Sequence, residues 1–169
     1  MSENPLQELL QSGLPEIDFG VMSHGFMEHG RDYRFIIEIG RAGTFELLFT
    51  HVVQLNYATR LSSEGWQRSW GDEFTDYQRW EASGEPDGYV FGTNWSLAYP
   101  GVTVADDNSD AIRWSRDLGR PMYAAQIETD RFSIVLVYAD VRMTQLSSEA
   151  STVGKVLIPL NGPPDELLE

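Results

Sequence analysis

Histidines are the side chains in this chain of 169 residues whose type is best suited to acid–base chemistry or metal binding. His24 and His29 flank Glu28, but their spacing matches no familiar set of metal ligands, and the glycine after each ring disfavours a helix that would align them. His51 falls on the apolar side of an alternating segment, where a histidine packed in the core is more common than a catalytic base. The histidines therefore predict no metal site, and no cofactor is expected.

Motifs of nucleophilic and nucleotide-dependent enzymes are absent from the sequence. The chain has no Cys, no G-x-S-x-G nucleophile motif, no G-x-G-x-x-G and no phosphate loop. Acidic pairs such as Asp72 with Asp76 fit a solvated surface more simply than a glycosidase or magnesium site. The sequence thus predicts a protein that is not an enzyme. An unrecognised enzyme or small-molecule binder, with a pocket lined by His51, Trp95 and Tyr99, stays open as the alternative.

The segment from Trp66 to Tyr99 is the stretch whose residue types suggest binding to another macromolecule. It mixes aromatic rings, which can anchor a protein interface, with carboxylates, which would steer a positively charged partner toward them. The competing interpretation packs the rings in the core and leaves the carboxylates in water. Under the binding interpretation, the candidate partner-binding residues are Asp72, Glu73, Asp76, Trp80, Glu81 and Trp95.

Charge and hydropathy restrict the kinds of partner that the chain can have. It carries 26 acidic and 12 basic side chains, for a formal net charge of −14, which repels nucleic acid and anionic membranes. The amino-terminal residues do not resemble a secretory signal, and no apolar run reaches the length of a membrane span. We therefore expect a cytoplasmic protein with a basic protein partner and with no nucleic-acid or membrane partner. The sequence indicates no oligomeric state.

Hydrophobic spacing predicts an α+β fold, mainly an antiparallel β-sheet with two hairpins and two or three short helices. One hairpin is predicted from strands over residues 33–39 and 45–57, which alternate apolar and polar side chains across a glycine-rich loop. A second hairpin is predicted with arms over 122–129 and 132–145.

Helical spacing and capping signals predict a short helix over residues 5–12, a second helix that Ser69 caps and Gly84 ends, and a third over 109–118 that Asn108 or Ser109 caps. Residues 89–99 are interpreted as a bent or bulged strand, followed by a turn at Pro100 and Gly101. No internal repeat or long linker divides the chain. We expect a single α+β domain over residues 1–160 and an acidic carboxyl-terminal tail over 161–169.

The order of short motifs along the chain resembles that of the YxiG-like family of small bacterial proteins, over about residues 20–147. The motifs that carry this resemblance are Asp32-Tyr33, Phe49-Thr50-His51, Ser69-Trp70-Gly71-Asp72-Glu73-Phe74, Gly88-Tyr89-Val90-Phe91-Gly92-Thr93-Asn94-Trp95 and Glu128-Thr129-Asp130-Arg131-Phe132. The family has no established catalytic activity, so the resemblance transfers no catalytic residue. It implies a genomic setting near polymorphic toxin systems, in which small acidic proteins commonly serve as immunity partners.

Charge, aromatic segment and family resemblance together predict a protein-binding module of the immunity or antitoxin type, which neutralises a basic toxin domain. The small-molecule alternative requires its three side chains to converge on one pocket. A third possibility, an assembly protein, requires a symmetric oligomer with a large apolar contact, and no feature of the sequence favours it.

Overall fold

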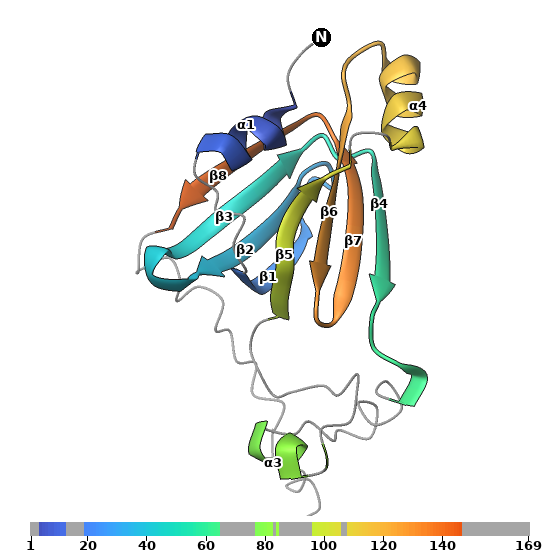
Figure 1. Ribbon diagram of the computed structural model, residues 1–169. Helices are drawn as coiled ribbons and strands as arrows, with labels where there is room; N and C mark the ends of the chain where they lie inside the picture. The colour runs from blue at the N-terminus through green and yellow to red at the C-terminus, as the bar shows by residue number, and fades with distance from the viewer. Residues whose placement is uncertain are drawn as a thin grey trace, which may run out of the picture.

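The computed structural model of the chain describes residues 4–12, 19–64, 77–82, 84, 96–105 and 108–146. An antiparallel β-sheet forms most of this part of the chain, and the helices Pro5–Ser12 and Ser109–Leu118 lie beside it (Figure 1). The elements are α1 Pro5–Ser12, β1 Phe19–Phe26, β2 Tyr33–Ile39, the 3₁₀ turn Gly40–Ala42, β3 Gly43–Thr50, β4 Gln54–Thr59, α3 Tyr77–Ala82, β5 Ser96–Val104, α4 Ser109–Leu118, β6 Tyr123–Thr129, β7 Phe132–Tyr138 and β8 Asp140–Gln145.

The sheet folds back on itself around one corner. Its strand order is β4-β7-β6-β5-β1-β2-β3-β8, and every neighbouring pair is antiparallel. Two pairs of successive strands, β3 with β4 and β7 with β8, nevertheless lie far apart in this order. Both pass through the corner, where the Ala139 amide donates to the Thr50 carbonyl at 3.0 Å and the Val53 amide donates to the Val137 carbonyl at 2.9 Å. The two halves of the sheet therefore face each other.

The corner corrects the prediction of one strand over 45–57 and of one hairpin arm over 132–145. His51 adopts a left-handed backbone conformation, with φ of 51°, and its amide donates to Asp32 Oδ1 at 2.9 Å instead of to a strand. The second break falls at Ala139, opposite Thr50. In both predicted segments, 45–57 and 132–145, the strands before and after the break turn apolar side chains toward the same core. The alternation of apolar and polar residues therefore continues across the break, and the sequence does not reveal it.

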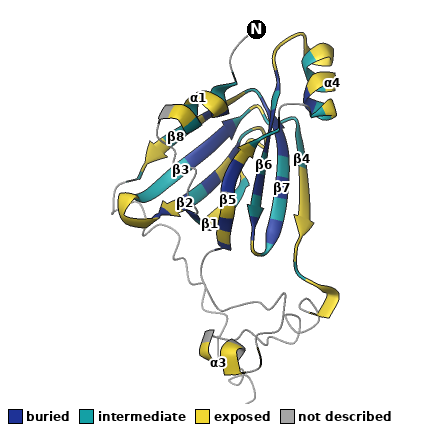
Figure 2. Cartoon of the chain, in the orientation of Figure 1, coloured by how far each residue is buried: buried dark blue, intermediate teal, exposed yellow. Residues whose placement is uncertain are grey.

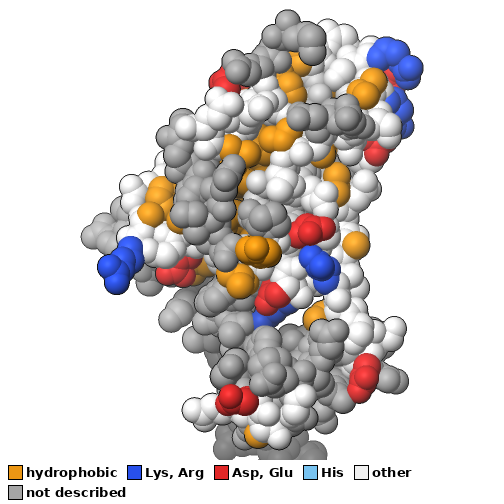
Figure 3. Space-filling model, viewed as in Figure 1, with side chains coloured by type: hydrophobic (Ala, Val, Ile, Leu, Met, Phe, Trp, Pro, Cys, Tyr) orange, Lys and Arg blue, Asp and Glu red, His pale blue; other side chains and the backbone are white. Residues whose placement is uncertain are grey.

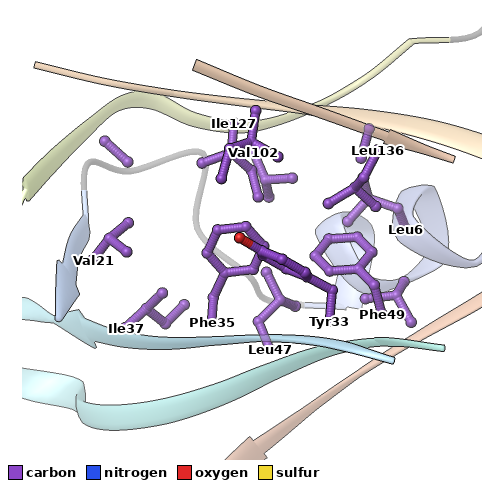
Figure 4. Close-up of a cluster of buried hydrophobic side chains, with 14 of the residues drawn as sticks. Leu6, Val21, Tyr33, Phe35, Ile37, Leu47, Phe49, Val102, Ile127 and Leu136 are labelled. Atoms are coloured by element: carbon purple, nitrogen blue, oxygen red, sulfur yellow. The ribbon is translucent and has the colours of Figure 1, made fainter. Parts of the chain in front are cut away.

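Buried residues occur in the strands of both halves of the sheet (Figure 2), and their side chains form a core between the two halves (Figure 4). Phe35 and Phe49 come from one half, and Ile127 and Leu136 come from the other. Leu6 of α1 joins them and is fully buried. Asn4 holds the start of this helix, because its Oδ1 accepts from the Leu6 amide at 3.0 Å and from the Tyr138 hydroxyl at 3.2 Å. The predicted helix over 5–12 is thus confirmed as part of the core.

Leu6 gives a direct test of this packing. Replacing Leu6 by Ala removes apolar contacts and leaves a cavity, so the free energy of unfolding is expected to fall by about 2–5 kcal/mol. Urea denaturation measures the change. Gln7→Ala in the same helix changes an exposed side chain and should shift the free energy by less than about 0.5 kcal/mol. Equal effects of the two substitutions would show that α1 does not pack on the sheet.

Helix α4 begins and ends where the sequence predicts. Asn108 Oδ1 accepts from the amides of Asp110 and Ala111, at 3.0 and 3.1 Å, and Gly119 ends the helix with φ of 64°. Gln54, the first residue of β4, holds the helix on the sheet. Its Oε1 accepts from Trp114 Nε1 at 3.0 Å, and its Nε2 donates to Asp110 Oδ2 at 2.6 Å.

Two further sequence predictions need correction or stay open. Strand β1 was not predicted, and Pro100 with Gly101, interpreted as a turn, lies within β5. Of the helix predicted between Ser69 and Gly84, the structure describes Tyr77–Ala82 as α3, and the preceding residues lie outside the described ranges. The mainly antiparallel sheet is confirmed.

Candidate partner-binding surface

The neighbouring strands β1 and β5 each contain a shift in their pairing register. The surface beside these two shifts is the most distinctive of the sheet. β1 pairs with β5, with Gly20 opposite Leu97. The pairing of β1 with β2 shifts between Val21 and Ser23, and the pairing of β5 with β6 shifts between Ala98 and Gly101. Each shift inserts extra residues into one strand, as in a β-bulge, and bulges redirect side chains away from the regular ladder.

Apolar side chains point outward at these bulges. Met22 is 36% exposed, Leu97 is 40% exposed and Tyr99 is 69% exposed, although the residues next to them in the strands, such as Val21 and Ala98, are buried in the core. Leu97 lies between the buried Ser96 and Ala98, and the extra residues Met22 and Tyr99 directly follow the buried Val21 and Ala98, so all three lie on the outer side of β1 and β5. We call Met22, Leu97 and Tyr99 the outer patch. Figure 3 shows exposed hydrophobic side chains on the molecular surface with acidic and basic side chains beside them.

The backbone under the outer patch is held by the turn between β6 and β7. The Leu97 amide donates to Asp130 Oδ1 at 3.0 Å, and the Asp130 amide donates to the Leu97 carbonyl at 2.9 Å. Partial burial raises the pKa of the Asp130 carboxyl above its ordinary value, although the Arg131 guanidinium acts in the opposite direction. The turn itself is closed by Thr129, whose Oγ1 accepts from the amides of Arg131 and Phe132 at 3.1 and 2.9 Å. These hydrogen bonds therefore fix the backbone that carries Leu97 of the outer patch.

The acidic excess of the chain does not come from the described residues. They include 12 of the 26 acidic side chains and ten of the 12 Lys and Arg, so their formal charge is close to zero. The remaining acidic residues include those of residues 65–76 and 85–95, in the connection between β4 and β5. That connection enters β5 at Ser96, beside Leu97 in the chain. The outer patch is thus continuous in sequence with the acidic and aromatic segment.

Most of the predicted partner-binding residues lie outside the described ranges. These are Asp72, Glu73, Asp76 and Trp95. Trp80 and Glu81 lie in α3, where Glu81 is exposed. Their arrangement around a partner remains a prediction. Sequence reasoning missed Met22 and Leu97, since only the pairing of β1 with β5 reveals that they share a face with Tyr99.

Two residues of the alternative pocket, His51 and Tyr99, lie far apart. His51 is exposed at the corner of the sheet, which corrects the prediction that it lies on the apolar face of a strand; the left-handed turn carries its side chain outward. Tyr99 lies near the turn at the other end of β7. A strand the length of β7 spans about 20 Å, so the two side chains are too far apart to line one small pocket. Trp95 lies outside the described residues.

A different histidine occupies an aromatic environment. His24 Nδ1 lies 2.7 Å from the Tyr33 hydroxyl, and its ring centroid is 4.6 Å from that of Phe132 and 5.7 Å from that of Phe35. Burial lowers the pKa of His24 below 6.5 and raises the pKa of Tyr33 to about 12, an increase to which Tyr57 also contributes. Near neutral pH, His24 is therefore uncharged and Tyr33 keeps its proton. The pair joins β1 and β2 to the aromatic rings of the opposite half of the sheet.

His24 should make the stability of the protein depend on pH. The pKa of His24 is lower in the folded than in the unfolded chain. The contribution of His24 to the free energy of unfolding is therefore complete above about pH 6.5 and is lost as the pH falls through 6.5 toward the lowered pKa. The free energy of unfolding is expected to fall by at most about 1.4 kcal/mol per pH unit in that range. Urea denaturation of the wild type and His24→Gln at several pH values measures this dependence, which the substitution should reduce. Equal slopes in the wild type and His24→Gln would contradict the assignment.

Comparison with known proteins places the chain in a family. The family described as YxiG-like protein matches over residues 3–155, which include every described strand and helix. The chain belongs to the YxiG-like family. No curated protein matches it. A solved structure of an uncharacterized protein from Neisseria gonorrhoeae resembles it at 8% sequence identity and a TM-score of 0.36, covering 77% of this chain and 93% of the other.

The described part of this YxiG-like chain contains neither a cluster of metal ligands nor a helix that could span a membrane. Within that part, no three His, Asp or Glu side chains gather where a metal ion could bind. His29 Nε2 lies 3.6 Å from Asp32 Oδ2, and His24 bonds to Tyr33 instead. No helix in the described ranges is both long enough and apolar enough to cross a lipid bilayer.

Proposed function

We propose that this YxiG-like protein is a protein-binding module of the immunity type, which neutralises a toxin by covering a basic surface of its toxic domain. The observation that carries the proposal is the outer patch, where bulges in two adjacent strands expose Met22, Leu97 and Tyr99 on one face. The acidic and aromatic segment enters the same strand at Ser96.

The two parts of this surface would contribute differently to binding. Tyr is among the residues that most often dominate the energy of protein interfaces, because its rigid ring buries much apolar area at little entropic cost, and Met is enriched in interfaces. Carboxylates at the rim contribute mainly to the association rate and to the choice of partner. A toxin whose active site carries positive charge, such as a nuclease, is the partner that fits both parts.

The net charge of −14 disfavours the competing classes of macromolecular partner. Phosphate backbones and anionic lipids would be repelled by such a field, whereas a basic protein domain would be attracted. The near-neutral sheet would then serve as the support, and the carboxylates in the connection between β4 and β5 would supply part of the negative charge.

Coexpression with the adjacent toxin gene tests the proposal. The full chain should restore growth of cells that make the toxin, and a tagged toxin should retain it in a pull-down. Tyr99→Ala should reduce both effects, whereas Ile112→Ala, which removes an exposed apolar side chain from α4, should leave them intact. Absence of a complex together with absence of growth rescue would exclude the immunity role.

A further inference from the structure

Five aromatic side chains from both halves of the sheet meet at one place. They are His24 and Phe26 of β1, Tyr33 of β2, Tyr57 of β4 and Phe132 of β7. The ring centroid of His24 lies 6.0 Å from that of Tyr33, 6.3 Å from that of Tyr57 and 4.6 Å from that of Phe132. Phe26 packs at a right angle to Tyr33, with centroids 4.9 Å apart. We call these five residues the aromatic cluster.

Two rings of the aromatic cluster reach the solvent. Phe26 is 50% exposed and Tyr57 is 53% exposed, whereas Tyr33 and Phe132 are buried. The ring of Phe26 contacts that of Tyr33, and the ring of Tyr57 contacts those of His24 and Phe132. Within the described ranges, no ring contact joins Phe26 to Tyr57, so neither exposed ring covers the other. Their exposed surfaces are therefore available to a group from outside the chain.

The aromatic cluster offers negative potential and carries no positive charge. The face of an aromatic ring has partial negative charge. His24 Nδ1 lies 2.7 Å from the Tyr33 hydroxyl, and burial lowers the pKa of His24, so the imidazole is uncharged near neutral pH. In the part of the chain that the structure describes, the guanidinium of Arg113 lies over Trp114 at 5.3 Å, and no Lys or Arg lies over the aromatic cluster. The cluster thus lacks a cation of its own.

We propose that the aromatic cluster binds the guanidinium group of an arginine side chain on a basic protein partner. A guanidinium is planar, stacks on aromatic rings and donates hydrogen bonds. The ring planes of His24 and Tyr57 differ by 25°, as do those of Tyr57 and Phe132. A planar cation can therefore stack on the exposed Tyr57 ring in nearly the same orientation as the rings beside it. The Tyr57 hydroxyl oxygen can accept one of its hydrogen bonds.

The aromatic cluster is a second contact site, separate from the outer patch. It lies on the core side of β1, as the contact of His24 with Phe132 indicates, whereas Met22 of the outer patch lies on the outer side. Arginine is enriched in protein interfaces, so a basic partner can supply the side chain. The inference rests on the proposed function for the kind of partner, whereas binding of the guanidinium itself does not.

A bound guanidinium must act on the protonation of His24. Imidazolium would repel it, so binding must lower the pKa of His24 further, and the affinity must fall as the pH falls below that pKa. Among the described residues that pack against His24, Tyr33 of β2 and Tyr57 of β4 can titrate, β7 contributes Phe132, and no carboxylate acts on the pKa of His24. Phenols keep their protons over the range in which histidine titrates, so the change belongs to His24.

Titration of the full chain with N-acetylarginine amide, followed by NMR of the His24 ring protons at several pH values, tests the inference. The backbone of this probe is uncharged, so its guanidinium is its charge. It should bind with a dissociation constant in the millimolar range and lower the pKa of His24. N-acetylcitrulline amide has nearly the same shape without the charge and should bind at least about fivefold more weakly. Sodium chloride at equal ionic strength corrects for screening.

Three variants locate the bound probe. Tyr57→Leu and Phe26→Leu each remove an exposed ring of the aromatic cluster and should raise the dissociation constant at least about threefold. Tyr99→Leu makes the same change at an exposed ring outside the cluster and should leave it within about 1.5-fold. Thermal unfolding confirms that all three variants fold.

Several results would overturn the inference. These are equal binding of the arginine and citrulline derivatives, an unchanged His24 signal up to about 50 mM probe, and an equal loss of affinity in Tyr57→Leu and Tyr99→Leu. Free arginine that binds at least about tenfold more tightly than the blocked probe would assign the site to the amino acid and overturn its assignment to a protein partner. A toxin that forms no complex in the coexpression experiment would remove the immunity role and leave the result with the probe unaffected.

Discussion

Replacing both Leu97 and Tyr99 by Ala is expected to raise the dissociation constant for the toxin partner by about 30-fold to about 1,000-fold. Tyr99 is 69% exposed and Leu97 is 40% exposed, neither side chain belongs to the core cluster, and Leu97 binds Asp130 through its backbone. The double substitution therefore removes apolar surface without removing a side chain of the core. A loss of about 2–4 kcal/mol is typical when two anchors at the centre of an interface are truncated. Isothermal titration calorimetry with the purified toxin domain measures it.

Ile112→Ala with Leu118→Ala is the matched control for this experiment. It removes two exposed apolar side chains from α4, away from the outer patch, and should change the dissociation constant by less than about twofold. Both double variants should unfold at urea concentrations close to that of the wild type. If the two variants bind the toxin domain equally well, the outer patch is not the contact surface.

Reversing Asp72, Glu73 and Asp76 to Lys is expected to slow association with the toxin domain by about tenfold or more at low ionic strength. These carboxylates belong to the acidic segment that precedes β5, and a field of opposite sign would repel a basic partner before contact. Salt screens such interactions, so the rates of variant and wild type should converge as salt is added. Stopped-flow fluorescence at several salt concentrations measures both effects.

A variant of equal net charge separates local steering from total charge. Reversing Glu8, Glu38 and Asp117 to Lys changes the formal charge by the same amount, at exposed positions in α1, β2 and α4. Its association rate should stay within about threefold of the wild-type rate. An equally large decrease of the association rate in both variants would mean that net charge alone attracts the partner and that the position of the carboxylates in the acidic segment has no effect.

Local signals explain the elements that sequence reasoning predicted well. The helix over 5–12 and the helix capped by Asn108 depend on contacts within a few residues, such as the bonds of Asn108 Oδ1 to the amides that follow it. Strand β2 follows from strict alternation, with Tyr33, Phe35, Ile37 and Ile39 all buried. Capping and period-two spacing act within one element and are therefore visible in the sequence.

The incorrect predictions concern features that depend on residues far away in the chain. The corner at His51 needs Asp32 as an acceptor and Ala139 as a neighbour, and neither is signalled by the sequence around His51. Strand β1 was missed because the register shift after Val21 interrupts its alternation. In β5, Pro100 and Gly101 predicted a turn. Gly101 adopts a positive φ of 89° at the bulge, a conformation that glycine tolerates, so the strand continues beyond it.

The sequence by itself determined that this chain is acidic, that it forms a mainly antiparallel sheet with capped helices, and that it resembles the YxiG-like family. Composition and short-range periodicity suffice for these properties. Only the tertiary structure decided that Met22, Leu97 and Tyr99 share one face, that His51 and Tyr99 lie apart, and that His24 meets Tyr33. The physical reason is that strand pairing joins segments separated by many residues, and a single bulge or corner changes which side chains meet without altering the local pattern.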